Sequence, residues 1–486
     1  MNIISKKKNI WTDLSEPTKA SIAFIVCGFL QKGISTITTP IFTRLLSTQE
    51  YGYYSIYNSW ADIFSVFITL RLGGSVFMQA IVKYNKDNEK FTSSTIGLGT
   101  ICTLLTYLLY LVFHRFFNRI LGMDLFIVTC IFVSSWSCLM FDIWADRKRC
   151  DYTYKSLVIL TLISSLAKPL TGIFAILISN GDRAQARIVS LVIVEFLSFS
   201  WIFFYYLYKG KALFNKEYWK YSLSMNVPLI PHYLTRMVLN QSDKLMIQYM
   251  VGYSAAGIYG LGHSIAWMLT LITSSIMNSY SPWIFKKIND REYERISQKT
   301  NYIVGIVGIV GLIICIFTPE IVGIFAPETY KNAIYIIPPL VLSVYFMFLY
   351  NVFATFEYYF EKTWYLMSAS LLGGVLNVIL NYLFIKKFGY IAAGYTTLVC
   401  YIFYALIHYY FMRKIADENV GEISVFDTKF IIIISIFFIV FMFLLLLIYK
   451  TIIIRYILVL VIGCIGIIFR KKIIELFNEI KKEKRI

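Results

Sequence analysis

Four polar side chains on one predicted helix are placed to act together on a charged solute. They lie at positions i, i+4, i+8 and i+11 of a single face: His232, Arg236, Asn240 and Asp243. This spacing confines them to a narrow sector of the helix. Lys244 follows directly and adds a second cation. Such a group of side chains can bind a charged solute or relay a proton.

Other predicted helices carry comparable residues. Two stripes have the spacing i, i+4, i+7 and i+11: Lys32, Thr36, Thr39 and Thr43 in the first, and Asn58, Asp62, Ser65 and Thr69 in the second. Gln31 and Ser35 lie beside the first stripe, and Arg71 lies on a different face from the second. Lys168, next to Pro169, and Glu195 stand in two further apolar segments.

The segments that hold these residues are predicted to cross a membrane. Hydrophobic residues make up 58% of the 486 residues, and the mean hydropathy is +0.65. A spanning helix needs about 20 apolar residues, and such stretches recur along the chain, so we expect an all-α polytopic membrane protein rather than a barrel. Fourteen spans are predicted: 20–45, 53–82, 94–114, 121–145, 156–179, 186–208, 219–250, 253–285, 301–326, 332–360, 363–385, 390–412, 430–449 and 451–469.

The positive charges of the chain are unevenly distributed. Lys and Arg are concentrated in the amino-terminal arm, in alternate loops and after the last predicted span. By the positive-inside rule, this predicts that both termini lie in the cytoplasm of an inner-membrane protein. A nucleic-acid partner is not expected, because no basic domain stands apart from the spans. The cysteines and the four histidines show no metal-ligand spacing, so we expect no metal or cofactor.

Charges at bilayer depth are costly unless they face water or a partner, so their positions indicate a transport pathway. The predicted ligands of the solute are Lys32, Arg71, Lys168, Arg236, Lys244, His232 and Asn240. The candidates for ion coupling are Asp62, Glu195 and Asp243. The alternative is that these charges form structural ion pairs between helices, for which Asp243 beside Arg236 and Lys244 is the best example.

An internal repeat divides the chain. Residues 45–56 align without gaps with residues 250–261 at a shift of 205 residues, so that Gly52 matches Gly257. Because six predicted spans separate the two copies, both run in the same sense across the membrane. We therefore predict two pseudo-symmetric six-helix halves, 1–210 and 211–415, followed by two additional spans and a basic cytoplasmic tail in 416–486.

Three strings carry a resemblance to a known family. They are PIFTRLLSTQEYGYYSIYNSW at 40–60, SDKLMIQYMVGYSAAGIYGLGHSI at 242–265 and LNVILNYLFIKKFGYIAAGYTTLVCYIFY at 376–404. The chain resembles the Wzx-type polysaccharide-biosynthesis and O-antigen flippases of the multidrug/oligosaccharidyl-lipid/polysaccharide (MOP) exporter superfamily. The resemblance implies a MATE-like fold in which the two halves alternate access to a central cavity.

The resemblance also implies a substrate. Such a protein moves a polyprenyl-pyrophosphate-linked oligosaccharide from the cytoplasmic to the periplasmic leaflet, driven by an ion gradient, for O-antigen or capsule assembly. Glycosyltransferases, a polysaccharide polymerase and membrane lipids are the implied partners. The family's cationic cavity would correspond here to Lys32, Arg71, Lys168 and Arg236. Asp62 and Asp243 depart from a purely cationic lining and leave the charge of the substrate open.

Two other functions remain open. A multidrug exporter of the same superfamily would favour a more acidic or aromatic pocket. A membrane-embedded polymerase or glycosyltransferase would place catalytic residues on large extramembrane loops, whereas the loops predicted here are short. We therefore do not expect an enzyme.

Overall fold

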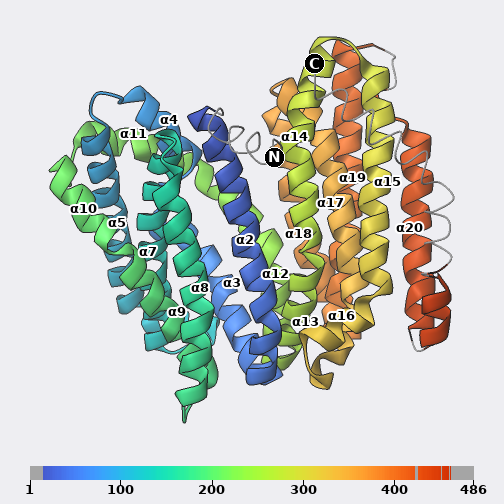
Figure 1. Ribbon diagram of the computed structural model, residues 1–486, viewed down its shortest axis with the longest axis horizontal. Coiled ribbons are helices and arrows are strands. Elements are labelled where there is room, and N and C mark those ends of the chain that lie inside the picture. Colours follow the sequence, from blue (N-terminus) through green and yellow to red (C-terminus); the bar gives the residue numbers. More distant parts are fainter. Residues whose placement is uncertain (1–14, 422–424, 450, 459, 461–486) are drawn as a thin grey trace, which may run out of the picture. The chain divides into compact units, whose positions relative to one another are not determined.

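The computed structural model describes residues 15–421, 425–449, 451–458 and 460, and all regular elements in this part of the chain are helices (Figure 1). The prediction of an all-α protein is therefore confirmed. The described part of the chain begins with the α-helices α2 (Glu16–Leu45), α3 (Thr48–Thr69), α4 (Ser75–Lys83), α5 (Asn88–Val112), α6 (His114–Leu121), α7 (Leu125–Cys150), α8 (Tyr154–Ile178), α9 (Arg183–Phe199), α10 (Trp201–Gly210), α11 (Lys216–Asn226) and α12 (Ile230–Met250).

The later α-helices are α13 (Tyr253–Ala266), α14 (Leu269–Asn289), α15 (Tyr293–Ile316), α16 (Thr318–Phe325), α17 (Ile337–Tyr359), α18 (Thr363–Phe388), α19 (Ala392–Asn419) and α20 (Thr428–Ile448). Two 3₁₀-helices, η1 (Val227–Leu229) and η2 (Glu328–Tyr335), interrupt the series.

Ten helices of the described chain are long and apolar enough to cross a membrane. The predicted spans 53–82, 219–250 and 390–412 are not among these ten, and most of 451–469 lies outside the described residues. The first two of these spans carry polar stripes, and the third carries several tyrosines and His408. These side chains lower the mean hydropathy, so a criterion based on composition alone passes over segments that are rich in polar side chains.

Several predicted spans are divided between separate helices, among them 53–82, 186–208, 219–250, 253–285 and 301–326. The breaks in the two segments with polar stripes have identifiable causes. Segment 53–82 forms α3 and α4, because Leu70 and Arg71 adopt the left-handed conformation with φ of 49°. The N–H group of Gly74, at the start of α4, donates to the carboxylate of Asp146. Segment 219–250 is interrupted at η1, which contains Pro228, because proline lacks the N–H group that would continue the helix.

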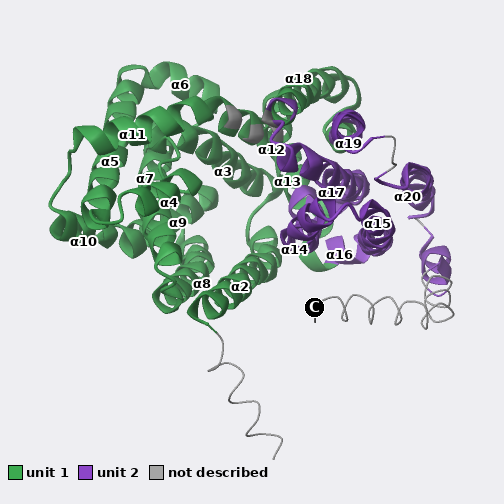
Figure 2. Ribbon diagram, turned by 90° about the horizontal axis from the view of Figure 1, so that it is seen from above, with its two compact units in different colours: residues 1–261, 324–330, 366–396 green, residues 262–323, 331–365, 397–486 purple. Residues whose placement is uncertain are grey.

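The described helices fall into two compact units (Figure 2). Unit 1 comprises residues 1–261, 324–330 and 366–396, and unit 2 comprises 262–323, 331–365 and 397–486. In unit 1, α8 packs against both α2 and α9, and α7 packs against α9. In unit 2, α17 packs against α14, α15 and α20. The division into 1–210, 211–415 and 416–486 stays a prediction.

A close contact within unit 1 follows the register of the internal repeat. A Cβ atom at Gly52 would collide with the carbonyl of Tyr253, and one at Gly257 would collide with the carbonyl of Thr48. The shift of 205 residues converts Thr48 into Tyr253 and Gly52 into Gly257, so the contact is reciprocal. The backbones of α3 and α13 can approach this closely only because both positions are glycine.

Candidate functional site

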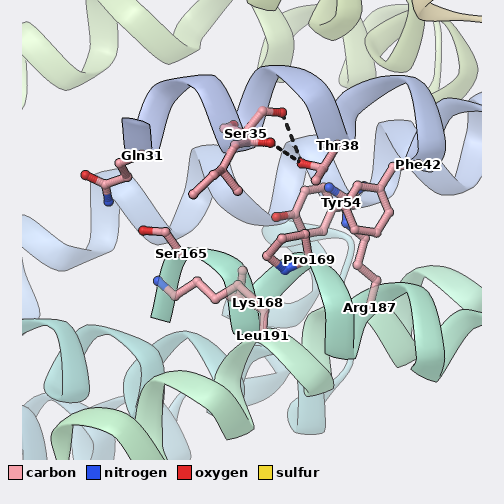
Figure 3. Close-up of a pocket in the computed structure, with 11 residues that line it drawn as sticks. Gln31, Ser35, Thr38, Phe42, Tyr54, Ser165, Lys168, Pro169, Arg187 and Leu191 are labelled. Carbon is pink, nitrogen blue, oxygen red and sulfur yellow. Dashed lines mark hydrogen bonds between the residues drawn. The ribbon is translucent and has the colours of Figure 1, made fainter. Parts of the chain in front are cut away.

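A polar pocket of about 220 Å³ lies among α2, α3, α8 and α9 of unit 1. Its lining combines hydroxyl and amide groups, two aromatic rings and two cations: Gln31, Ile34, Ser35, Thr38, Phe42, Tyr54, Ser165, Lys168, Pro169, Arg187 and Leu191. Figure 3 shows the α2 side chains facing Ser165, Lys168 and Pro169 of α8. We call this site the unit 1 pocket.

Lys168 belongs to the pocket, but its charge is matched by a carboxylate. Its Nζ atom lies 2.7 Å from Oε1 of Glu195, whose side chain is only 6% exposed. Ser134 donates a hydrogen bond of 2.5 Å to Oε2 of the same carboxylate. Two predicted residues with separate roles, a solute ligand and an ion-coupling acid, therefore form one ion pair. This contact agrees with the alternative interpretation, in which buried charges form structural ion pairs between helices.

Arg187 supplies the second cation of the pocket, and sequence analysis did not single it out. Its guanidinium carbon lies 3.6 Å from the ring centroid of Phe42 and 3.5 Å from that of Tyr54. A planar guanidinium stacks well on aromatic rings, and such cation–π contacts hold the group in a fixed plane. Its Nη1 atom is buried and has no hydrogen-bond partner within the described structure. This cation therefore has donor capacity to offer a ligand.

The position of Arg187 follows from the start of α9. Asp182 caps the helix by accepting a hydrogen bond from the N–H of Gln185, and Arg187 lies one turn further on. The predicted span 186–208 begins at this point, so the sequence alone indicates an ordinary charged residue at the end of a membrane span. Nothing in the local sequence shows that Phe42 and Tyr54, more than a hundred residues away, flank it.

The residues of α2 that line the pocket lie beside the predicted polar stripe of Lys32, Thr36, Thr39 and Thr43. Gln31, Ser35 and Thr38 line the pocket, whereas Lys32 is exposed and outside the lining. Thr43, from the predicted stripe, is buried and donates to the carbonyl of Phe325 at 2.5 Å. Gln31 and Ser35, which lie beside the predicted stripe in the sequence, thus form the polar face of the pocket together with Thr38.

A second polar cluster surrounds Asp243, which is 3% exposed. Its carboxylate accepts hydrogen bonds from Tyr259 at 2.6 Å, Asn381 at 2.6 Å and Asn377 at 3.1 Å. Thr396 in turn donates to the Oδ1 atom of Asn381 at 2.5 Å. These side chains come from α12, α13, α18 and α19, and all belong to unit 1. We call them the Asp243 cluster.

The Asp243 cluster contains carboxylate, amide and hydroxyl oxygen atoms, which are the ligand types that small hard cations prefer. In this structure the hydroxyl group of Tyr259 and the amide N–H groups of Asn377 and Asn381 are directed at the carboxylate, so hydrogen-bond donors occupy its oxygen atoms. A cluster of three or more His, Cys, Asp or Glu side chains suited to a metal ion is absent from the described residues. Asn377 and Asn381 were not predicted, although two asparagines at i and i+4 within an apolar helix are visible in the sequence.

The remaining predicted residues divide into three groups. Gln241 links the first group, because it donates to Asp62 at 2.8 Å and accepts from Lys244 at 3.2 Å. Asp62 is exposed, while Lys244 and its neighbour Asn240 are half-buried. In the second group, Arg71 occupies the turn after α3, with Nη2 lying 3.9 Å from the sulfur of Met237. The third group lies outside the described side chains: His232 and Arg236.

Two solved structures share the fold of this chain. A solved structure of the lipid II flippase MurJ, in an inward closed conformation, aligns with 93% of this chain and 100% of its own, at a TM-score of 0.66 and 18% identity. An inward-facing multidrug resistance MATE family transporter of the MOP superfamily aligns with 81% of this chain and 96% of its own, at a TM-score of 0.64 and 11% identity. The chain therefore has the fold of the MOP superfamily of flippases and exporters.

Sequence similarity then identifies the family. The polysaccharide biosynthesis protein family matches residues 18–288, and the MatE family matches residues 228–383. Because the first match extends over more than half of the sequence, this chain belongs to the polysaccharide biosynthesis protein family. The predicted family resemblance is confirmed.

Two proteins of Haemophilus influenzae are similar to part of this chain. Lsg locus protein 1 is 18% identical over 291 residues, which cover 56% of this chain and 67% of that protein. An uncharacterized membrane protein is 22% identical over 287 residues, which cover 56% of this chain and 65% of that protein. The matched segments thus span about two thirds of each relative.

Proposed function

We propose that this protein is a flippase that moves a polyprenyl-pyrophosphate-linked oligosaccharide from the cytoplasmic to the outer leaflet of a bacterial inner membrane. The isoprenoid tail stays in the lipid while the charged head group passes through the protein by alternating access. The family match supports a role in polysaccharide assembly, with glycosyltransferases and a polymerase acting before and after this step. Both termini are proposed to lie in the cytoplasm, where the positive-inside rule places them.

The unit 1 pocket carries this proposal. A diphosphate or an acidic sugar leaving water needs compensating cations, because an unpaired buried charge is heavily penalised. Glu195 already compensates Lys168, so we assign the ligand role chiefly to Arg187. Phe42 and Tyr54 hold its guanidinium in place before the substrate arrives, which lowers the entropy cost of binding. The hydroxyl and amide groups on α2 suit the sugar hydroxyls.

Arg187→Ala tests the role of the pocket. We expect transfer of the lipid-linked oligosaccharide in proteoliposomes to fall by about tenfold or more, because hydrogen bonds to charged groups contribute about 1.5–3 kcal/mol. Arg187→Lys should recover only part of the rate, since an ammonium group does not reproduce the planar stack. Arg183→Ala is the matched control, because Arg183 lies one turn earlier on α9 and outside the pocket lining. Unchanged transfer by Arg187→Ala at normal protein levels would remove the proposed role.

We further propose that Asp243 is the ion-coupling residue among the three predicted acids. Glu195 is held by Lys168, and Asp62 is exposed, whereas Asp243 is buried among oxygen and amide groups that suit a bound cation. Asp243→Asn should abolish the acceleration of transfer by an imposed sodium or proton gradient. Gradient-dependent transfer that survives this substitution would move the coupling site elsewhere.

The match of the MatE family to residues 228–383 favours a second candidate, a multidrug exporter. The two functions predict opposite substrate charges, because Arg187 suits an anion and would repel a cationic drug. Expression of the protein in a drug-sensitive host distinguishes them. Resistance to cationic dyes that persists in Arg187→Ala would favour drug export over the proposed flippase.

A further inference from the structure

Unit 2 contains a buried pair of ionisable side chains that the proposed function does not use. Oε1 of Glu357, in the last turn of α17, lies 2.6 Å from Nδ1 of His408 on α19. Glu357 is 0% exposed and His408 is 2% exposed. The ring of His408 stacks on Tyr350 at 5.2 Å and on Tyr404 at 6.1 Å between ring centroids. Neither member of the pair was singled out by sequence analysis.

The charged groups near this end of unit 2 make contacts of their own. Phe285 of α14 contacts Tyr359 of α17, and Phe426, shortly before α20, contacts Phe356, so the ends of these helices lie together. Ion pairs among the described residues here include Lys287 with Glu292, Arg295 with Glu292, Lys362 with Glu418, and Arg413 with Asp417. Asp427 accepts from Asn301, and Lys414 lies over the ring of Tyr365. The pair itself is surrounded by aromatic rings.

The second carboxylate oxygen makes this pair sensitive to protons. Oε2 of Glu357 is buried and has no hydrogen-bond partner within the described structure. Burying an ionised carboxylate in this way is costly unless a proton or a cation compensates it. One proton shared by the carboxyl and imidazole groups leaves the pair neutral overall. Removing that proton would leave a bare negative charge at the C-terminal end of α17, where the helix dipole also disfavours it.

We propose that Glu357 and His408 form a proton-binding site that fastens α17 to α19. One proton holds the two side chains together, and its release weakens the contact between the helices. Glutamate and histidine suit this role, because the side chains of both residues can gain and lose a proton. Proton binding needs no substrate, and only its consequence for transport depends on the proposed function.

Hydrogen exchange of the full chain in nanodiscs tests the site. After correction for the intrinsic exchange rate, protection of α17 and α19 in the wild type should fall with rising pH, by up to about tenfold per pH unit for one coupled proton. Glu357→Gln keeps the size and a hydrogen bond but cannot carry the proton, so its protection should not change with pH. Asp417→Asn, in the partly exposed Arg413–Asp417 pair, should retain the wild-type profile.

Two results would overturn the proposal: a wild-type profile that is independent of pH, or a Glu357→Gln profile that matches the wild type. If Glu357→Gln fails to reach the membrane, His408→Gln and the wild-type measurement decide the question in the same way. A purely structural pair would lower protection equally at every pH. Failure of the flippase proposal would appear in the Arg187 variants and would leave this profile unchanged.

Discussion

Two buried glutamates, one in each unit, show how the same side chain acquires different properties. In unit 1, Glu195 has a partner for each oxygen, because Lys168 and Ser134 both donate to it. In unit 2, Glu357 has only His408 on one oxygen, and its other oxygen has no partner within the described structure. Lysine binds Glu195 as an ammonium group, whereas the imidazole of histidine can bind a carboxyl group in either a neutral or a charged form. The first pair is therefore a permanent ion pair beside a pocket, and the second can respond to protons.

The largest expected effect tests whether the unit 1 pair is permanent. Glu195→Ala should destabilise the protein by about 3–5 kcal/mol, because it leaves Lys168 uncompensated in a largely buried place. The double variant Lys168→Met with Glu195→Leu should recover most of this loss, since two apolar side chains replace the pair. Thermal unfolding in detergent measures both variants. A double variant as unstable as the single one would show that the pair does more than neutralise its own charges.

An intermediate effect compares the packing of the two units. Gly257→Ala should cost about 1–3 kcal/mol, because its Cβ atom would press against the carbonyl of Thr48 and the backbones of α3 and α13 would have to separate. Gly305→Ala in α15 of unit 2 is the matched control, as nothing lies within 4 Å of its added Cβ atom. The control should be neutral or slightly stabilising, because alanine favours the helix. Equal unfolding temperatures for the two variants would contradict the reciprocal contact.

The smallest effect concerns the ion pair of Lys287 and Glu292 in unit 2. A hydrogen bond from Lys287, with help from Arg295, lowers the pKa of Glu292 below its ordinary value of 4.5. Because the pKa is lowered in the folded state, the stabilisation is complete above pH 4.5 and is lost as the pH falls through the lower value. Wild type and Glu292→Gln should therefore differ slightly in unfolding temperature at neutral pH and converge in acid. A difference that grows on acidification would reverse the assigned sign.

Some site residues are readable in the sequence, and others are not. The repeat register predicted the equivalence of Gly52 and Gly257, and the polar stripe on α12 contained Asp243. Arg187 was missed because its position in the pocket depends on stacking against two aromatic rings, Phe42 of α2 and Tyr54 of α3. Lys168 and Glu195 were recognised singly, but their separation of 27 residues, on two different helices, gives no local sign that they meet.

The amino-acid sequence by itself determined that the chain is helical and membrane-embedded, because hydropathy and its period are properties of each segment. It also indicated the internal repeat and the family, because short stretches of matching residues are visible in the sequence without any structure. The tertiary structure alone decided which charges are compensated, which cation faces the unit 1 pocket and which carboxylate lies beside a histidine. A sequence shows the face of a helix on which a side chain lies, but the helix that meets that face is selected by packing across the whole unit.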